Sequence, residues 1–188
     1  MKKLLLSAAL LAAGLFANDA KAQSNVFKVN IFSPIVSTAS VFYERAISDD
    51  KSVQLGFFYT GFKVTDTKFS GFGITPELRF YLSESNAPEG FYVAPFARYQ
   101  NFTLTNEFED FSGGGGTTKS EATLSTIGGG VIAGKHWIFK ERISLDAFLG
   151  PQLNSGSVEV KSGDESSFST GAFSGFGIRT GLTFGVAF

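Results

Sequence analysis

The last fourteen residues of the chain alternate strictly between large apolar and small or polar side chains. This segment, "GFGIRTGLTFGVAF", spans residues 175–188, and an alternation of period two indicates a β-strand. The opposite face is mostly glycine and carries Arg179 as its charged residue. The large side chains can face the core of a soluble sandwich or the lipid of a membrane, and this choice decides the class of protein. They are Phe176, Ile178, Thr180, Leu182, Phe184, Val186 and Phe188.

The first 22 residues have the pattern of a secretory signal peptide. Lys2 and Lys3 precede an apolar run over residues 4–16, and "AKA" stands before Gln23. The apolar run is shorter than the ~20 residues that a membrane-spanning helix needs. We therefore expect a signal peptide at 1–22, cleaved after residue 22, and one exported domain at 23–188. Because the chain has no cysteine, we expect neither disulfides nor a lipid anchor on a cysteine.

Composition excludes several classes of function. Without the signal peptide the chain loses three of its 16 basic and one of its 17 acidic residues, so its net charge is −3, and no basic footprint for nucleic acid remains. No stretch after residue 22 is long and apolar enough for a transmembrane helix. The 22 phenylalanines and 22 glycines are typical of strands that bend and place rings at interfaces. No cluster of His or Cys predicts a metal site, and we expect no cofactor.

Strand-like patterns recur along the domain, and helical periodicity is absent. The connections after the second, fourth and sixth strands are short and polar, whereas those after the fifth and seventh are long. An outer-membrane barrel has this asymmetry, with tight turns at one end and long loops at the other, although a soluble sandwich could have it by chance. The predicted strands are roughly 25–33, 36–48, 51–64, 69–83, 90–104, 121–139, 141–155 and 171–188.

The two faces of each strand differ in the same way. In the strand at 69–83, Phe72 and Ile74 share the apolar face, while Glu77 and Arg79 share the opposite face with glycines. Inside a narrow barrel the inner face must be small, because facing side chains meet near the axis. We therefore expect the apolar faces to meet lipid. Lys135 falls on the apolar side of its strand, so it either snorkels to the interface or marks a bulge.

These observations predict an all-β fold, an eight-stranded antiparallel transmembrane β-barrel with up-and-down meander order. Its first strand closes against its last, because a sheet cannot leave an edge unpaired in hydrocarbon. The segments "VFYERAI", "GFGITPELRFYL", "GKHWIF" and "LDAFLGPQL" resemble the small outer-membrane β-barrel families, OmpX- or OmpW-like. The resemblance implies a place in the cell outer membrane, among its lipids. It also implies insertion by the barrel assembly machinery, with Phe184 and Phe188 in the terminal strand as the assembly signal. We expect no peptidoglycan-binding domain after the barrel, in which the chain departs from two-domain OmpA-type proteins.

Charged residues on the predicted inner faces form the first candidate site. They could act as a selectivity ring or a proton path. Alternatively, they form an interlocked salt-bridge core, because eight strands leave an interior that side chains fill, and buried charges need partners. We favour the salt-bridge core, and any conduction should then be small. The candidates for this lumen charge network are Glu44, Glu77, Arg79, Arg98, Asp146 and Arg179.

Enzymatic activity is a weaker hypothesis. Small outer-membrane barrels include lipid A acyltransferases, lipid A deacylases and proteases, whose chemistry recruits a His beside a Ser or an acid. This chain has a single histidine, His136, which the topology places at the periplasmic side beside Trp137. We expect an interfacial girdle there, where amphipathic rings settle, although the lumen or lipid facing of Lys135, His136 and Trp137 stays open. We therefore predict no catalytic residues.

The long connection after the fifth strand is the second candidate site. Its acids and rings could recognise an external partner with a bridging divalent cation, although exposed loops are polar in any such barrel. We expect a structural, adhesive or surface-binding role for the protein. A narrow, porin-like channel for small or hydrophobic solutes is the alternative. The outer-loop binding candidates are Glu107, Phe108, Glu109, Asp110 and Phe111.

Overall fold

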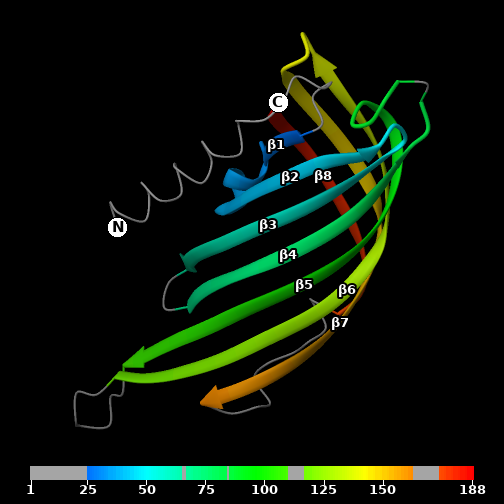
Figure 1. Ribbon diagram of the computed structural model, residues 1–188. Coiled ribbons are helices and arrows are strands. Elements are labelled where there is room, and N and C mark those ends of the chain that lie inside the picture. The colour runs from blue at the N-terminus through cyan, green and yellow to red at the C-terminus, as the bar shows by residue number, and fades with distance from the viewer. Residues whose placement is uncertain (1–24, 65–66, 84, 110–116, 163–173) are drawn as a thin grey trace.

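The computed structural model describes residues 25–64, 67–83, 85–109, 117–162 and 174–188. These residues form eight antiparallel strands that close into a barrel in meander order, which confirms the predicted fold class (Figure 1). A single turn of 3-10 helix, η1, follows the first strand. The elements are β1 (Asn25–Asn30), η1 (Ser33–Val36), β2 (Thr38–Ser48), β3 (Lys51–Val64), β4 (Thr67–Tyr81), β5 (Gly90–Glu109), β6 (Thr117–Phe139), β7 (Ile143–Ser162) and β8 (Gly175–Ala187).

The barrel closes between β1 and β8, as the sequence predicts. Val26 pairs with Ala187 and Asn30 with Thr183. Beyond these pairs, the backbone N–H of Asn25 donates to the carbonyl oxygen of Phe188 at 3.1 Å, and that of Phe188 donates back at 2.9 Å. A closed ladder leaves no unpaired sheet edge. The described part of the chain contains no helix long and apolar enough to cross a membrane.

The two ends of the barrel differ in their connections. The turns after β2, β4 and β6 lie at the end that holds Asn25 and Phe188, which we call the terminus end. The connections after β1, β3, β5 and β7 lie at the opposite end, which we call the loop end. The predicted grouping of the turns after β2, β4 and β6 at one end is therefore confirmed. Their lengths follow the prediction only in part, because the connection after β4 (82–89) is about as long as that after β5 (110–116), and the connection after β3 covers only 65–66.

The strands β5, β6 and β7 are longer than predicted. They contain 20, 23 and 20 residues, and β5 pairs with β6 without interruption as far as Glu109 and Thr117. Much of the predicted loops at 105–120 and 156–170 is therefore strand. Polar sequence alone does not end a strand, because the ladder is made by the backbone. Figure 1 shows β5 and β6 reaching past the loop-end tips of β3 and β4.

Other strand boundaries move by a few residues. β1 ends at Asn30 and not at residue 33, because its side-chain Oδ1 accepts from the backbone N–H of Phe32 at 3.0 Å and η1 begins at Ser33. Pro34 favours this turn, since proline has no N–H for a ladder. Consequently β2 starts at Thr38. The strand β4 runs two residues earlier than predicted, and β8 starts at Gly175.

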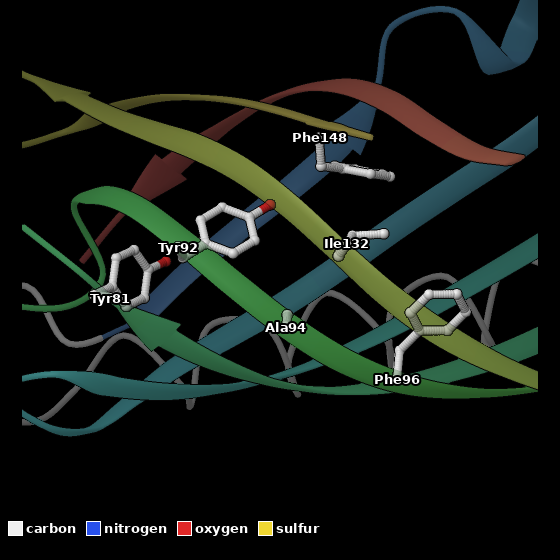
Figure 2. Packing of buried hydrophobic residues seen from close by; sticks show 6 residues of the cluster. All are labelled: Tyr81, Tyr92, Ala94, Phe96, Ile132 and Phe148. Carbon is white, nitrogen blue, oxygen red and sulfur yellow. The ribbon is translucent and has the colours of Figure 1, made fainter. Parts of the chain in front are cut away.

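The large apolar side chains point outward, as expected from the alternation. In β8 Ile178 is 66% exposed, whereas its neighbour Arg179 is 4% exposed. In β7 Leu149 is 58% exposed and Asp146 is fully buried. This polarity is the reverse of a soluble sandwich, in which the large residues would form the core. A smaller apolar cluster lies inside the barrel, composed of Tyr81, Tyr92, Ala94, Phe96, Ile132 and Phe148 (Figure 2).

Inner glycines make room for aromatic rings on the neighbouring strand. Tyr92 pairs directly with Gly134, and a Cβ at Gly134 would lie 2.5 Å from Cζ of the tyrosine ring. The small residues are thus required by cross-strand neighbours, and not only by crowding near the axis as the sequence suggested. Other directly paired rings and glycines are Phe42 with Gly56, Phe58 with Gly73, Phe102 with Gly71 and Phe148 with Gly181.

Candidate functional site: the interior charge network

Four charged side chains from four strands meet inside the terminus half of the barrel. Lys28 Nζ donates to Glu44 Oε2 at 2.5 Å and to Asp146 Oδ2 at 2.9 Å. Arg79 Nη1 donates to the same two oxygens at 3.2 and 2.7 Å. All four side chains are fully buried. Each carboxylate therefore lies between two cations, which offsets the cost of burying it.

Hydroxyl groups satisfy the remaining carboxylate oxygens. Tyr81 donates to Glu44 Oε1 at 2.6 Å, and Ser52 donates to the same atom. Tyr92 donates to Asp146 Oδ1 at 2.8 Å, and its ring lies under the Arg79 guanidinium at 4.3 Å. Figure 2 shows the two tyrosine rings at one end of the apolar cluster. The tyrosines therefore join the apolar cluster to the charges.

Glu77 extends the network towards the loop end. Its Oε2 accepts from Arg79 Nη2 at 3.1 Å, and its Oε1 accepts from Arg179 Nη2 at 2.5 Å. Arg179 also lies over the rings of Phe96 and Phe148, at 4.5 and 4.9 Å. Ion pairs thus run continuously from β1 through β2, β7 and β4 to β8.

Arg98 lies apart from the other predicted lumen residues. Its Nε donates to Thr75 Oγ1 at 3.1 Å and its Nη1 donates to Gln152 Oε1 at 3.4 Å. It forms no ion pair with the residues that the structure describes. Five of the six predicted lumen residues therefore come together as ion pairs, and the sixth contacts neutral acceptors. Whether the network has any role beyond structure stays a proposal.

Sequence reasoning missed Lys28. The alternation that places Lys28 on the inner face is present in the sequence, because its neighbours Phe27 and Val29 are large and apolar. In the structure these two residues are 47% and 40% exposed on the outer face. The strand has only six residues, so its alternation is short. Lys28 supplies the second cation for both Glu44 and Asp146.

The expected position of His136 in an outer girdle is wrong. Its side chain is fully buried inside the barrel, where Nε2 lies 2.6 Å from Ser144 Oγ and Nδ1 lies 3.3 Å from the Tyr81 hydroxyl. Strand alternation is the reason, because His136 shares the inner face with Ile132, which is also fully buried. Adjacent residues of a strand point to opposite faces, so an outward Trp137 places His136 on the inner face.

The contacts of His136 resemble a catalytic arrangement of Ser, His and acid. Glu44 Oε2 lies 3.6 Å from Nδ1, on the side of the ring opposite Ser144. A triad of this kind needs a nucleophile that a substrate can reach. Ser144 has no exposed surface, and Glu44 is held by Lys28 and Arg79. In this structure His136 is hydrogen-bonded to Ser144 and to the Tyr81 hydroxyl, which in turn donates to Glu44, so the three residues belong to one packed, buried cluster.

Lys135 and Trp137 lie on the outer face. The Lys135 ammonium lies 4.5 Å from the centre of the Phe91 ring and 5.3 Å from that of Trp137. The pairing of β6 with both neighbours keeps one register through this region, so no bulge explains the lysine. Of the two explanations predicted for Lys135, the structure therefore agrees with the first, an outward side chain near the end of the barrel, and not with a bulge.

The outer-loop candidates are only partly described. Glu107, Phe108 and Glu109 belong to the loop end of β5, and the structure describes their backbone pairing with β6. Asp110 and Phe111 lie outside the described residues, as does the predicted signal peptide. Binding by these residues is therefore untested.

A cavity of about 360 Å³ lies on the loop side of the network. Arg98, Arg179 and Gln100 line it together with inward-facing phenylalanines and the residues Ser33 and Val36 of η1. Among the described residues, no group of three or more His, Cys, Asp or Glu side chains could hold a metal ion. The interior thus consists of a packed charge network at the terminus end and an open chamber towards the loop end.

The fold and its interior define a class: a closed eight-stranded barrel with an apolar exterior and a charged core. The chain belongs to the family described as "Protein of unknown function (DUF3575)", whose model matches residues 6–152. The search of curated proteins gave no match. The crystal structure of the N-terminal β-barrel domain of Pseudomonas aeruginosa OprF aligns with a TM-score of 0.38 at 15% identity, covering 89% of this chain and 100% of that one. The resemblance to OmpX- or OmpW-like families stays a prediction.

Proposed function

We propose that this chain is an integral barrel of the outer membrane without enzymatic activity, whose interior is structural and whose working surface is the loop end. The observation that carries the proposal is the inverted polarity, with charges buried inside and large apolar side chains exposed outside. Exposed apolar surface of this extent is typical of a surface that meets lipid or a partner. On this barrel the exposed apolar side chains come from strands all around the wall, from β1 to β8.

The pattern along β5 supports lipid as the surroundings. Its outward positions carry Phe91, then Val93, Pro95 and Ala97, then Tyr99. The two aromatic residues are eight positions apart, roughly 27 Å along a strand and about 20 Å across the membrane when the strand is tilted by ~40°. Outer-membrane barrels carry aromatic girdles around an apolar band about 25 Å tall.

Neighbouring strands continue both girdles. At the loop side Tyr59 and Phe72 pair across β3 and β4, and the Phe72 ring lies 6.3 Å from Tyr99. At the terminus side Trp137 and Phe139 lie on the outer face of β6 near Phe91. Lys135 between these rings can reach the polar interface with its ammonium group.

A surface-binding or adhesive role is supported by the length of β5, β6 and β7. A transmembrane strand needs ~9–11 residues, and these strands contain 20 or more. The excess lies at the loop end, where the strands would project beyond the girdle that contains Tyr99. An external ligand would meet this projection first.

The narrow channel is the second candidate function, and the cavity at the loop end is the observation that favours it. Against it, Lys28, Arg79, Glu44 and Asp146 have no accessible surface, so the described interior is filled at their level. Insertion by the barrel assembly machinery is part of the same proposal. The assembly machinery would recognise β8, whose Phe184 is 46% exposed on the outer face.

The test is cell fractionation and planar-bilayer conductance. The full chain should be recovered in the outer membrane and should migrate differently on gels before and after heating, as folded barrels do. The purified barrel should then insert into planar bilayers with no stable current steps. Recovery as a soluble periplasmic protein would overturn the location, and reproducible ohmic steps would favour the channel.

A further inference from the structure

The chamber on the loop side of the charge network combines two arginines with aromatic walls. Arg98 enters it from β5 and Arg179 from β8. Its volume of about 360 Å³ is within the range of small-molecule sites. The rings that line the chamber are Phe42, Phe58, Phe69, Phe102 and Phe148.

Two hydrogen-bond donors of Arg179 are unsatisfied among the described residues. Its side chain is 3% exposed, and Nη2 donates to Glu77, but Nε and Nη1 have no hydrogen-bond partner among the described residues. Buried donors in folded proteins are nearly always satisfied, by protein, by water or by a ligand. Two orphan donors on one guanidinium therefore indicate that an acceptor belongs beside it.

Arg98 also forms no ion pair with the residues that the structure describes. Its acceptors, Thr75 and Gln152, are neutral, and the Phe58 ring lies 5.9 Å from its guanidinium. Arg98 and Arg179 line the same chamber, and two like charges in a low-dielectric interior repel each other. An anion between them would relieve this repulsion.

The described charges of the interior do not balance. Lys28, Arg79, Arg98 and Arg179 face Glu44, Glu77 and Asp146, which leaves one positive charge in excess. The excess is at the chamber, since ion pairs account for Lys28, Arg79 and Arg179, and none among the described residues involves Arg98.

We propose that the chamber is a binding site for a small organic anion, a carboxylate with an apolar or aromatic body. The carboxylate would accept hydrogen bonds from Arg98 and from Nε and Nη1 of Arg179, because a guanidinium offers donors in a fork that matches two carboxylate oxygens. The body would pack among the rings of Phe58, Phe102 and Phe148. This site goes beyond the proposed function and needs only the folded barrel.

Benzoate is a suitable test ligand, because it joins a carboxylate to one ring. The full mature barrel, refolded in lipid nanodiscs, is titrated with benzoate while the Nε–H resonances of Arg98 and Arg179 are followed by NMR. Benzyl alcohol serves as the neutral analogue, and chloride at equal ionic strength as the bare anion. The variants are Arg98→Gln, Arg98→Lys and the control Arg142→Gln, which removes an exposed charge in the turn between β6 and β7.

Benzoate should shift both arginine resonances, and benzyl alcohol should bind about tenfold or more weakly, as expected when hydrogen bonds to a charged group are lost. Arg98→Gln should lose affinity by a similar factor, Arg98→Lys should retain part of it, and Arg142→Gln should bind as the wild type does. Arg98→Gln breaks no ion pair, so its barrel should fold.

Three outcomes would overturn the proposal. The first is equal shifts with benzoate and benzyl alcohol, and the second is unchanged affinity in Arg98→Gln. The third is saturation by chloride at the same concentration as benzoate, because it would remove the role of the apolar walls. The comparison of the three ligands uses the wild-type barrel, so it remains decisive if a variant fails to fold.

Discussion

Arg79 Nη1 lies 2.7 Å from Asp146 Oδ2, although the two residues are 67 positions apart and come from strands that are not neighbours in the sheet. The contact spans the lumen from β4 to β7. Lys28 reaches the same oxygen from β1. Side chains therefore cross-link the barrel through its interior, in addition to the ladder that closes its wall.

The first prediction concerns Asp146. Asp146→Asn leaves Lys28 and Arg79 without one of their carboxylates, and removing one partner of a buried ion pair costs about 3–5 kcal/mol. The free energy of unfolding in lipid vesicles, measured with urea, should fall by this amount. Asp49→Asn is the matched control, because Asp49 is exposed in the turn after β2. Equal stability of both variants would contradict a stabilising network.

The second prediction concerns the glycine beneath Tyr92. Gly134→Ala places a methyl group 2.5 Å from the ring and 2.8 Å from the carbonyl oxygen of Ala147. Overpacking of this kind costs typically ~1–3 kcal/mol, which denaturant titration of the refolded barrel would measure. Gly61→Ala should be tolerated, since its nearest side-chain atom lies 3.6 Å away. A neutral Gly134→Ala would mean that the ring is not held against β6.

The third prediction tests the outer face. Leu149→Arg places a charge in the apolar band, where it should cost roughly 2–4 kcal/mol in a bilayer. Ser157→Arg is its control on the same strand, outward-facing and beyond the last outward leucine, Leu153. Refolding yield and stability in vesicles provide the measurement. If both arginines are tolerated alike, the band does not lie in hydrocarbon.

The fourth prediction concerns the buried cluster of Ser144, His136 and Glu44. Because Ser144 is inaccessible, Ser144→Ala and His136→Gln should leave the lipid A of the host cells as the wild type leaves it. Mass analysis of lipid A from cells with and without each protein is the measurement. Modified lipid A that appears with the wild type and reverts in Ser144→Ala would establish an enzyme.

Much of the interior could be predicted from the sequence, because strand alternation is a local property. The inward facing of Glu77, Arg79 and Arg179 follows from the glycines and large apolar residues around them. The same alternation places His136 inside, whereas grouping it with its neighbour Trp137 wrongly predicts an outer position.

The pairings could not be predicted, since they depend on how far each strand is staggered against the next. Glu77 pairs with Arg79 of its own strand, but its second partner is Arg179 of β8 and not Arg98 of β5, and no single strand contains that information. The ends of β5 and β7 were also missed, because polar residues pair as strands where the neighbouring backbone continues. Lys28 was not predicted as a lumen residue because its strand has only six residues, too few for a clear alternation.

Contact between the outer face and a bilayer can be measured through the fluorescence of Trp137, the single tryptophan of the chain. Trp137 lies on the outer face near the terminus end, in the proposed girdle. In vesicles of brominated lipids its emission should be quenched, and quenched most by bromines near the headgroup. In the double variant Trp137→Phe with Leu149→Trp, bromines deeper in the acyl chain should quench best. Emission from Trp137 that is unaffected by brominated lipid at any depth would contradict the account.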